Sequence, residues 1–400
     1  MTVYKINLLL IVSVIISGIS FLPSSIDHVI VVCVLLVFLI KNGLVVNKET
    51  FLVVVFLSLV LTVNTITSVT NASILNYFFN YYLYICPFLF YMVGLKLSKL
   101  KGIIFYESYI NLVIIIGVLN VMFSFVFGLL FGAVAPDVNS DIAFLRVQTG
   151  IIGSIVPQIS FTLFCFILSI YKMTVSGRFV YKLYAIILFL GLLTSYARLA
   201  ILLSIFVWFI YIHKKNKSIA IILLVTLGFS ISVSNSQLVT RFQAIAVDYS
   251  SSNLDSVGRG ALALGAFKIA RDSFPLGTGI SSWGSPGAEN AYSPYYFSYK
   301  VNHVYGLEPN AKELGRSFLI DSHVVQLIAE LGFIGAFLFF IAIFRLSSRY
   351  NKIRELNWLD YSMVFFAFAQ MLGTPFLYNP VSYFSFWIVV GMRKGLRDIN

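Results

Sequence analysis

Charged residues and cysteines are scarce in this chain of 400 residues. Only 11% of the residues are Asp, Glu, Lys or Arg, whereas 59% are hydrophobic, and the mean hydropathy is +0.91. Because a typical soluble domain has about 25% charged residues, this composition excludes an ordinary soluble enzyme or binding domain. The three cysteines, Cys33, Cys86 and Cys165, all lie within apolar runs, so they indicate neither a disulfide framework nor a metal site.

Several motifs of well-known catalytic sites are also missing. The segments predicted to lie outside the membrane contain no Asp-x-Asp pair that could hold a divalent metal beside a nucleotide-sugar. The chain has no Gly-rich phosphate loop with Lys and no Gly-x-Ser-x-Gly nucleophile elbow. We therefore expect no metal and no cofactor, and an enzyme with this sequence would act on a lipid-linked substrate.

Apolar runs of about twenty residues recur from one end of the chain to the other, and each could cross roughly 30 Å of hydrocarbon. The sequence therefore predicts an all-α, polytopic transmembrane helical bundle that forms one integral membrane domain, residues 1–400. The first run is followed almost at once by another, so we interpret it as a span and not as a cleaved signal peptide. We expect about twelve spans, at residues 6–22, 26–40, 51–69, 75–95, 103–132, 151–171, 180–196, 198–212, 218–234, 322–344, 358–374 and 377–392.

Basic residues predict the orientation of these spans. When the N-terminus is placed in the cytoplasm, most of the 28 Lys and Arg residues fall in loops on the cytoplasmic side. Both termini are then cytoplasmic. The net charge of +12 is explained by this topology and does not indicate a nucleic-acid partner.

One long polar stretch, residues 235–320, separates the ninth and tenth predicted spans on the outer side of the membrane. Within this extracytoplasmic loop the residues from Arg259 to Asp272 predict an amphipathic helix that lies along the membrane surface. Its apolar side is expected to consist mostly of Leu262, Leu264, Phe267 and Ile269. After it, Pro275 stops the helix, and Gly277 and Gly279 allow a turn. So much polar chain outside the bilayer predicts that this loop handles a substrate.

Arg198 lies near the middle of an apolar run of about 32 residues, Tyr181 to Ile212. A single helix of this length would be about 48 Å long, which exceeds the thickness of the bilayer. The basic clusters on either side also require an even number of crossings between them. We therefore predict a tight hairpin with residues 194–198 at its outer apex.

Arg198, Arg259 and His323 are the predicted catalytic residues. Two guanidinium groups at the outer surface could hold a diphosphate whose lipid tail stays in the bilayer. His323 begins the tenth span at the same level, where Asp321 or Ser322 could cap the helix and leave the imidazole facing the loop, ready to take a proton. Each residue could instead have a purely structural role. Arg198 could anchor the hairpin at the lipid head groups, Arg259 could form a surface salt bridge, and His323 could make an ordinary polar contact.

Five further residues are predicted to bind substrate: Arg241, Arg271, Tyr295, Tyr296 and Glu330. The tyrosines belong to an aromatic cluster that could stack on sugar rings, form a membrane-interface belt or pack the loop. Glu330 follows His323 by seven residues on the same helical face, and a carboxylate at that depth is expected to face the interior of the bundle. Pairing of Glu330 with another span is favoured over a proton relay.

Three segments resemble motifs of one family. Residues 194–198, Thr-Ser-Tyr-Ala-Arg, resemble the Ser/Arg hairpin motif of O-antigen polymerases (Wzy type) and the related O-antigen ligases. Residues 258–279 are similar to their Arg-led loop helix with a Pro-x-Gly-x-Gly turn, and residues 322–335 to their His-Asn-x-x-Leu…Glu-x-Gly-x-x-Gly helix. The motifs follow in the family's order. Val324 departs from the pattern, because many members have Asn there.

The resemblance implies glycosyl transfer on the outer side of the bacterial cytoplasmic (inner) membrane. The donor would be a glycan on undecaprenyl diphosphate, and the acceptor a sugar hydroxyl. In the family, residues matching Arg198 and Arg259 are thought to stabilise the diphosphate leaving group, and the residue matching His323 to activate the acceptor. We favour a polymerase that joins lipid-linked repeat units, with a possible chain-length regulator as partner. The alternatives are a ligase that transfers glycan to lipid A–core and a polysaccharide flippase or other transporter.

Overall fold

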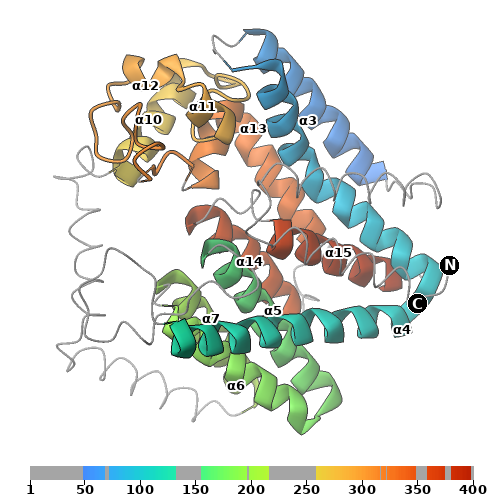
Figure 1. Ribbon diagram of the computed structural model, residues 1–400. Helices are drawn as coiled ribbons and strands as arrows, with labels where there is room; N and C mark the ends of the chain where they lie inside the picture. The colour runs from blue at the N-terminus through green and yellow to red at the C-terminus, as the bar shows by residue number, and fades with distance from the viewer. Residues whose placement is uncertain are drawn as a thin grey trace.

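A computed structural model describes residues 48–67, 72–131, 155–195, 198–215, 258–315, 317–320, 322–347, 358–373 and 380–397. The regular structure in these ranges is entirely helical, which confirms the predicted all-α class (Figure 1). The predicted spans 6–22, 26–40 and 218–234 lie outside the described residues, so the count of about twelve stays a prediction. The helices are α3 (Lys48–Thr67), α4 (Ile74–Phe131), α5 (Ile155–Ser176), α6 (Phe179–Thr194), α7 (Arg198–Lys215), α10 (Gly258–Asp272), α11 (Pro286–Asn290), α12 (Pro294–Ser298), α13 (His323–Ser347), α14 (Trp358–Gly373) and α15 (Pro380–Arg397).

Three helices in the described ranges are long and apolar enough to cross a membrane: Ile74–Val126, Gln158–Ser176 and His323–Leu346. Shorter apolar helices accompany them, and two of these belong to the predicted hairpin. The apolar run from Tyr181 to Ile212 divides into two helices as expected, because α6 ends at Thr194 and α7 begins at Arg198. The side of the membrane on which this break lies stays a prediction.

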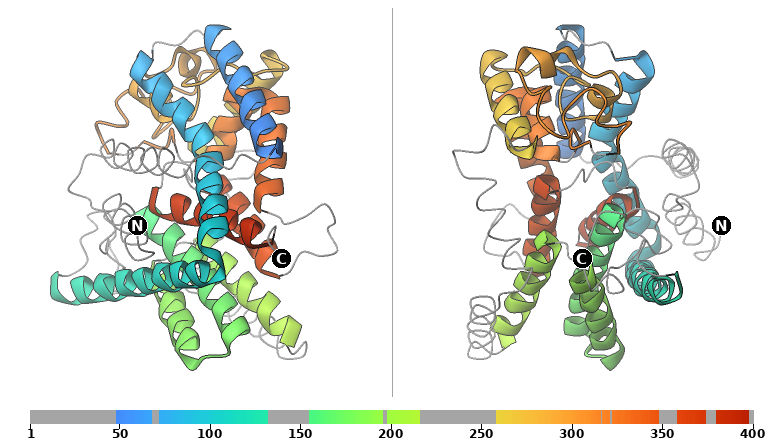
Figure 2. Two further views of the ribbon diagram at one scale, coloured as in Figure 1. Left: turned by 90° about the vertical axis from the view of Figure 1, so that its right-hand side faces the viewer. Right: turned by 60° about the vertical axis from the view of Figure 1, so that its left-hand side comes forward.

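Helix α4 differs from the prediction of two spans joined by a cytoplasmic loop. Residues 96–101 are helical, and the backbone leaves helical geometry at Gly102, with φ 67° and ψ −163°. Glycine adopts such a positive φ without the steric penalty of a Cβ atom, so one residue is enough to turn the chain. The second half of α4 then leaves the end of the first half at a steep angle instead of returning beside it (Figure 2).

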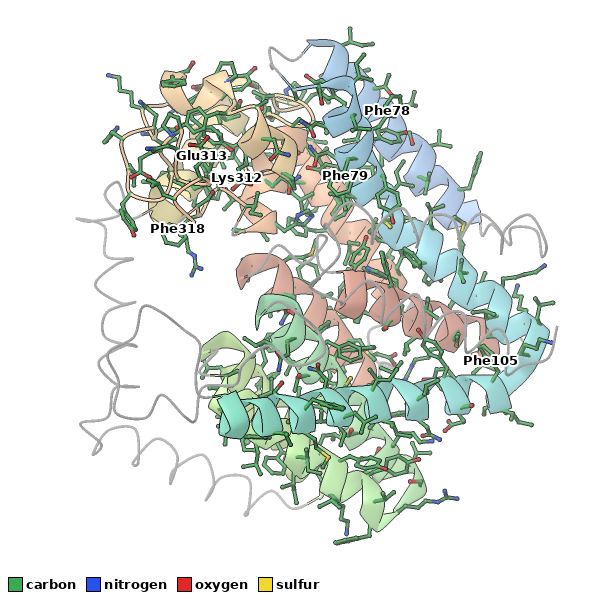
Figure 3. The ribbon with its side chains drawn as sticks, viewed as in Figure 1. Phe78, Phe79, Phe105, Lys312, Glu313 and Phe318 are labelled. Atoms are coloured by element: carbon green, nitrogen blue, oxygen red, sulfur yellow. The ribbon has the colours of Figure 1, made fainter. Side chains whose placement is uncertain are left out.

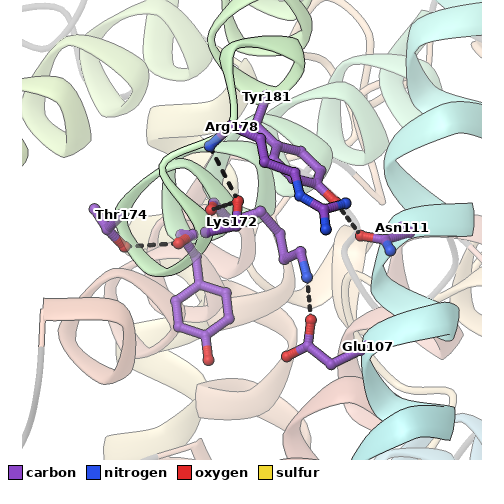
Figure 4. A network of polar contacts seen from close by, with 8 residues as sticks. Glu107, Asn111, Lys172, Thr174, Arg178 and Tyr181 are labelled. Atoms are coloured by element: carbon purple, nitrogen blue, oxygen red, sulfur yellow. Dashed lines mark hydrogen bonds and ion pairs between the residues drawn. The ribbon is translucent and has the colours of Figure 1, made fainter.

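Paired polar side chains fasten the second half of α4 to its neighbours (Figure 4). Lys172 of α5 forms an ion pair with Glu107 of α4, and the Lys172 side chain is almost fully buried. Beside it, the Tyr181 hydroxyl donates to the Asn111 side-chain oxygen over 2.8 Å, and the Lys172 ammonium lies 5.4 Å from the centre of the Tyr181 ring. A buried cation is costly unless it is paired, so these contacts fix how α4, α5 and α6 meet.

Helix α15 packs closely against the first half of α4 through glycines on both helices. A Cβ atom at Gly94 would lie 2.2 Å from the Ile388 carbonyl oxygen, and one at Gly391 would lie 2.1 Å from the Tyr91 carbonyl oxygen. At Gly395 the nearest atom, the Ser98 hydroxyl oxygen, would be 2.0 Å away. Gly391 and Gly395 are four residues apart, the spacing with which small residues let two membrane helices approach.

We expect Gly391→Leu to prevent stable folding, because a side chain there meets backbone atoms of α4 that cannot rotate away. Overpacking a core costs roughly 1–3 kcal/mol, and a clash with a carbonyl oxygen falls at the upper end or beyond. The measurement is thermal unfolding of the detergent-solubilised protein, followed by size-exclusion chromatography. Gly177→Ala is the control: no atom lies within 4 Å of its added Cβ, so it carries only the backbone strain of a positive φ of 65° and no collision. Equal melting temperatures for the two variants would contradict the packing described here.

Residues 258–320 fold around a small core of their own, to which α10, α11 and α12 contribute (Figure 1). Trp283 is fully buried in it, and its indole N–H donates to the Leu262 carbonyl oxygen over 3.1 Å. Val325 and Ala329 of α13 belong to the same cluster, so the segment is packed on α13. Lys312, Glu313 and Phe318 lie on this segment, away from Phe105 at the turn of α4 (Figure 3).

The predicted loop helix is confirmed as α10, but its apolar face differs from the prediction. Leu262 and Ile269 are buried, together with Gly and Ala residues, whereas the Phe267 side chain is 51% exposed. Small residues face the core because the Trp283 ring needs the space: a Cβ atom at Gly265 would lie 2.4 Å from it.

Candidate functional site

The glycine turn after α10 docks into a break in α13. The backbone of α13 leaves helical geometry at Gly332, with φ 68° and ψ 177°. The carbonyl oxygens of Ala329 and Glu330, just before the break, accept hydrogen bonds of 3.0 Å from the backbone N–H groups of Thr278 and Gly279. Because the helix is broken here, these two carbonyl oxygens lack donors from the helix, and the N–H groups of the turn supply them. The motif 273–279 and the motif 330–335 therefore form one structural unit.

The prediction of one uninterrupted helix over 322–344 is wrong at this break. An unbroken helix from His323 to Phe339 would separate their Cα atoms by about 24 Å. The two rings are instead 6.4 Å apart, so the second leg of α13 folds back towards the first. The Phe339 ring also meets the Tyr84 ring of α4 edge to face, with 6.1 Å between the centroids. The fold-back encloses His323 with aromatic side chains.

Glu330 is the centre of a buried hydrogen-bond network and has no exposed surface. Its Oε2 accepts from the Tyr84 hydroxyl over 2.6 Å and from the Gln326 amide over 3.0 Å. Its Oε1 accepts from the Ser285 hydroxyl over 2.7 Å and from the Ser282 backbone N–H over 3.0 Å. The carboxylate therefore ties the loop segment to both α13 and α4. The contact with Tyr84 of α4 is a pairing of Glu330 with another predicted span, which is the role that the sequence favours over a proton relay.

His323, the first residue of α13, is fully buried. Its Nδ1 lies 3.1 Å from Oε1 of Gln326, and its ring centroid lies 6.2 Å from that of Tyr84. The prediction that the cap leaves the imidazole free to face the loop is therefore wrong, because side chains of α13 and α4 enclose the ring. The Ser322 hydroxyl donates to the Leu372 carbonyl oxygen over 3.2 Å and ties the start of α13 to α14. Asp321 lies outside the described residues.

The structure describes the side chains of two of the four predicted arginines, Arg259 and Arg271. Arg259 and Arg271 both extend from α10, which packs along α13, and both side chains are exposed. Nε of Arg271 lies 3.1 Å from the Asp272 carboxylate. Arg198 begins α7, although its side chain lies outside the described part of the chain, as does the whole of Arg241. Among the predicted site residues, the described network joins His323 and Glu330.

The tyrosine cluster packs the loop segment. Tyr296 is fully buried, with ring centroids of Trp283 and Tyr292 at 4.8 Å and 5.1 Å, and its hydroxyl accepts from the Gly284 N–H over 3.0 Å. This burial raises the pKa of the Tyr296 hydroxyl far above its ordinary value, so the group stays neutral. Tyr295 is only half-buried and retains surface on which a sugar could stack.

Three side chains of the network were not predicted from the sequence: those of Gln326, Tyr84 and Ser285. Gln326 could have been found, because it lies three residues after His323 and four before Glu330, on the same face of a helix. Tyr84 and Ser285 carry no such signal, since they are distant in sequence. Within the described ranges, no three His, Cys, Asp or Glu side chains are grouped closely enough to hold a metal ion.

The comparison with known families agrees with the motifs. Residues 183–340 match the family model Wzy_C, described as O-antigen ligase. The match contains residues 194–198, α10 with its glycine turn, and both legs of α13 as far as residue 340. No curated protein matches the chain. Residues 183–340, less than half of the chain, are therefore similar to this family, whose members are glycosyltransferase-like enzymes.

Proposed function

We propose that this chain is a polymerase of a bacterial surface polysaccharide. It joins undecaprenyl-diphosphate-linked oligosaccharide repeat units on the outer side of the cytoplasmic membrane, in contact with membrane lipid, and a chain-length regulator is its proposed partner. One observation carries the proposal. The two longer motifs that resemble the family are hydrogen-bonded to each other at residues 278–279 and 329–330, and His323 begins the helix that holds them.

The proposed reaction needs a base at the acceptor and positive charge at the leaving group. His323 takes the proton of the acceptor hydroxyl while that oxygen forms a bond to the anomeric carbon of the donor. The bond from this carbon to the diphosphate oxygen breaks, and its electron pair stays on the diphosphate. Arg198 and Arg259 offset the negative charge that grows there, without a metal ion. Arg241, Arg271 and Tyr295 would hold the glycan.

Burial of His323 sets a requirement on this reaction. The imidazole has no exposed surface, so an acceptor hydroxyl reaches it only after the neighbouring chain moves aside. Glu330 is a poor candidate for the base, because the hydroxyl, amide and backbone donors around it engage both oxygens of its carboxylate. A purely structural histidine would need no such motion, and substitutions at His323 separate the two roles.

The second candidate function is that of a ligase, which is the activity by which the matching family is described. Deletion of the gene, followed by electrophoresis of the surface polysaccharide, distinguishes the candidates. We expect single repeat units attached to lipid A–core, the result for a lost polymerase. Bare core with accumulated lipid-linked polymer would indicate a ligase. Accumulation of single lipid-linked units inside the cell would indicate a flippase and would contradict both.

A further inference from the structure

The hydrogen bonds that lead from Glu330 to His323 have a direction that donors and acceptors alone determine. We propose that Glu330 and Gln326 are positioning residues that keep the proton of neutral His323 on Nδ1 and the lone pair on Nε2. This inference rests on the proposed role of His323 as the base. It adds which ring atom receives the proton of the acceptor hydroxyl, and what selects that atom.

The network starts at Glu330, whose carboxylate is surrounded by donors. Oε1 lies 3.0 Å and 3.4 Å from the backbone nitrogens of Ser282 and Trp283, and a backbone N–H can only donate. The Ser285 hydroxyl donates to the same oxygen over 2.7 Å. The Tyr84 hydroxyl donates to Oε2 over 2.6 Å. Both carboxylate oxygens therefore act as acceptors.

The carboxylate fixes the orientation of the Gln326 amide. Nε2 of Gln326 lies 3.0 Å from Oε2 of Glu330 and 3.1 Å from the Tyr84 hydroxyl oxygen. The NH₂ group has one proton for each of these oxygens. If the amide were flipped, its oxygen would face the Glu330 carboxylate at this distance, and two acceptors would repel each other. The amide oxygen therefore points in the other direction, to His323.

The amide oxygen in turn determines the tautomer of His323. Oε1 of Gln326 lies 3.1 Å from Nδ1 of His323 and carries no proton, so Nδ1 must donate. Neutral imidazole has one N–H, which leaves Nε2 as the basic atom. Because His323, Gln326 and Glu330 share one face of the first leg of α13, the chain from carboxylate to imidazole needs no other helix.

The tautomer is measurable without any substrate. The full-length protein, with His28, His213 and His303 replaced, retains a single histidine that can be labelled with ¹⁵N. We expect one protonated nitrogen signal assigned to Nδ1 and one unprotonated signal assigned to Nε2. In Gln326→Met, which keeps the length of the side chain but has no acceptor, the proton is expected to shift towards Nε2. Gln158→Met is the matched control, because it also removes a buried amide, one that donates to Ser124 over 2.6 Å.

Activity gives the second measurement. Polymer formation by Gln326→Met is expected to fall on the order of 10²- to 10⁴-fold in kcat, the range that general base catalysis contributes, with KM little changed. Gln158→Met should keep its rate. The double variant Gln326→Glu with Glu330→Gln exchanges the two groups, so that the new carboxylate accepts from Nδ1 and the new amide donates to it. We expect this double variant to recover the tautomer and at least part of the rate.

Three results would overturn the inference: a protonated Nε2 in the wild-type network, full activity of Gln326→Met, or a tautomer unchanged by that substitution. Failure of the proposed function gives a different result. In that case the purified wild-type protein makes no polymer from lipid-linked repeat units, while the ¹⁵N signals still report which ring nitrogen carries the proton.

Discussion

Gly332→Val is expected to abolish polymer formation by separating the glycine turn from α13. A Cβ atom at Gly332 would lie 2.5 Å from the Pro275 carbonyl oxygen and 2.6 Å from the Gly277 nitrogen. Both are backbone atoms, so no side chain can rotate to make room. The positive φ of 68° adds steric strain that a β-branched residue tolerates poorly. The hydrogen bonds from Thr278 and Gly279 to α13 would then be lost.

The control for this variant is Gly315→Ala. Gly315 has almost the same φ, 67°, but a Cβ atom there would have no neighbour within 4 Å. The variant Gly315→Ala therefore has the backbone strain of a positive φ, roughly 1–2 kcal/mol, but no contact like that between the new side chain of Gly332→Val and the backbone of the turn. The measurements are polymer formation and the rate of limited proteolysis within residues 258–320. If Gly332→Val digested no faster than Gly315→Ala and kept its activity, the docking of the turn would not be required for function.

The sequence predicts most helix boundaries well, because the runs are apolar and end at polar or breaking residues. The expected ranges 180–196, 198–212 and 358–374 differ from α6, α7 and α14 by three residues or fewer at each end. The turn at Gly102 falls in the predicted gap between residues 95 and 103, although a single residue makes it and residues 96–101 are helical. The turn at Gly332 is not predicted, because this glycine lies inside a run compatible with helix, and hydropathy records how apolar a residue is, not which φ it adopts.

The site was predictable only where its residues lie on one helix. The spacing of His323 and Glu330 correctly places both on the same face of α13. The contact of Glu330 with Tyr84 could not be predicted, because the two residues are 246 positions apart and Tyr84 lies in an apolar run. At the departure from the family's motif, Val324 packs against the large apolar core, and the side chain that contacts Nδ1 of His323 is that of Gln326.

His323→Ala and His323→Gln are both expected to abolish polymer formation while the protein is still produced and folded. A general base contributes on the order of 10²- to 10⁴-fold to the rate, and neither Ala nor a neutral amide can take up the proton. The assay uses purified variants in detergent with an undecaprenyl-diphosphate-linked repeat unit, and with EDTA present to test metal independence. His303→Ala is the control, because His303 is exposed on the loop segment.

A structural histidine at this position predicts the opposite order of the two variants. Gln can retain a hydrogen bond to Gln326, whereas Ala leaves the buried amide oxygen without its donor, which costs about 1–3 kcal/mol. Under that alternative, His323→Gln keeps its activity and His323→Ala lowers the melting temperature and the amount of protein. Polymer formation by His323→Gln at more than about one tenth of the wild-type rate would remove His323 as the base, since the loss would fall below the contribution expected of general base catalysis.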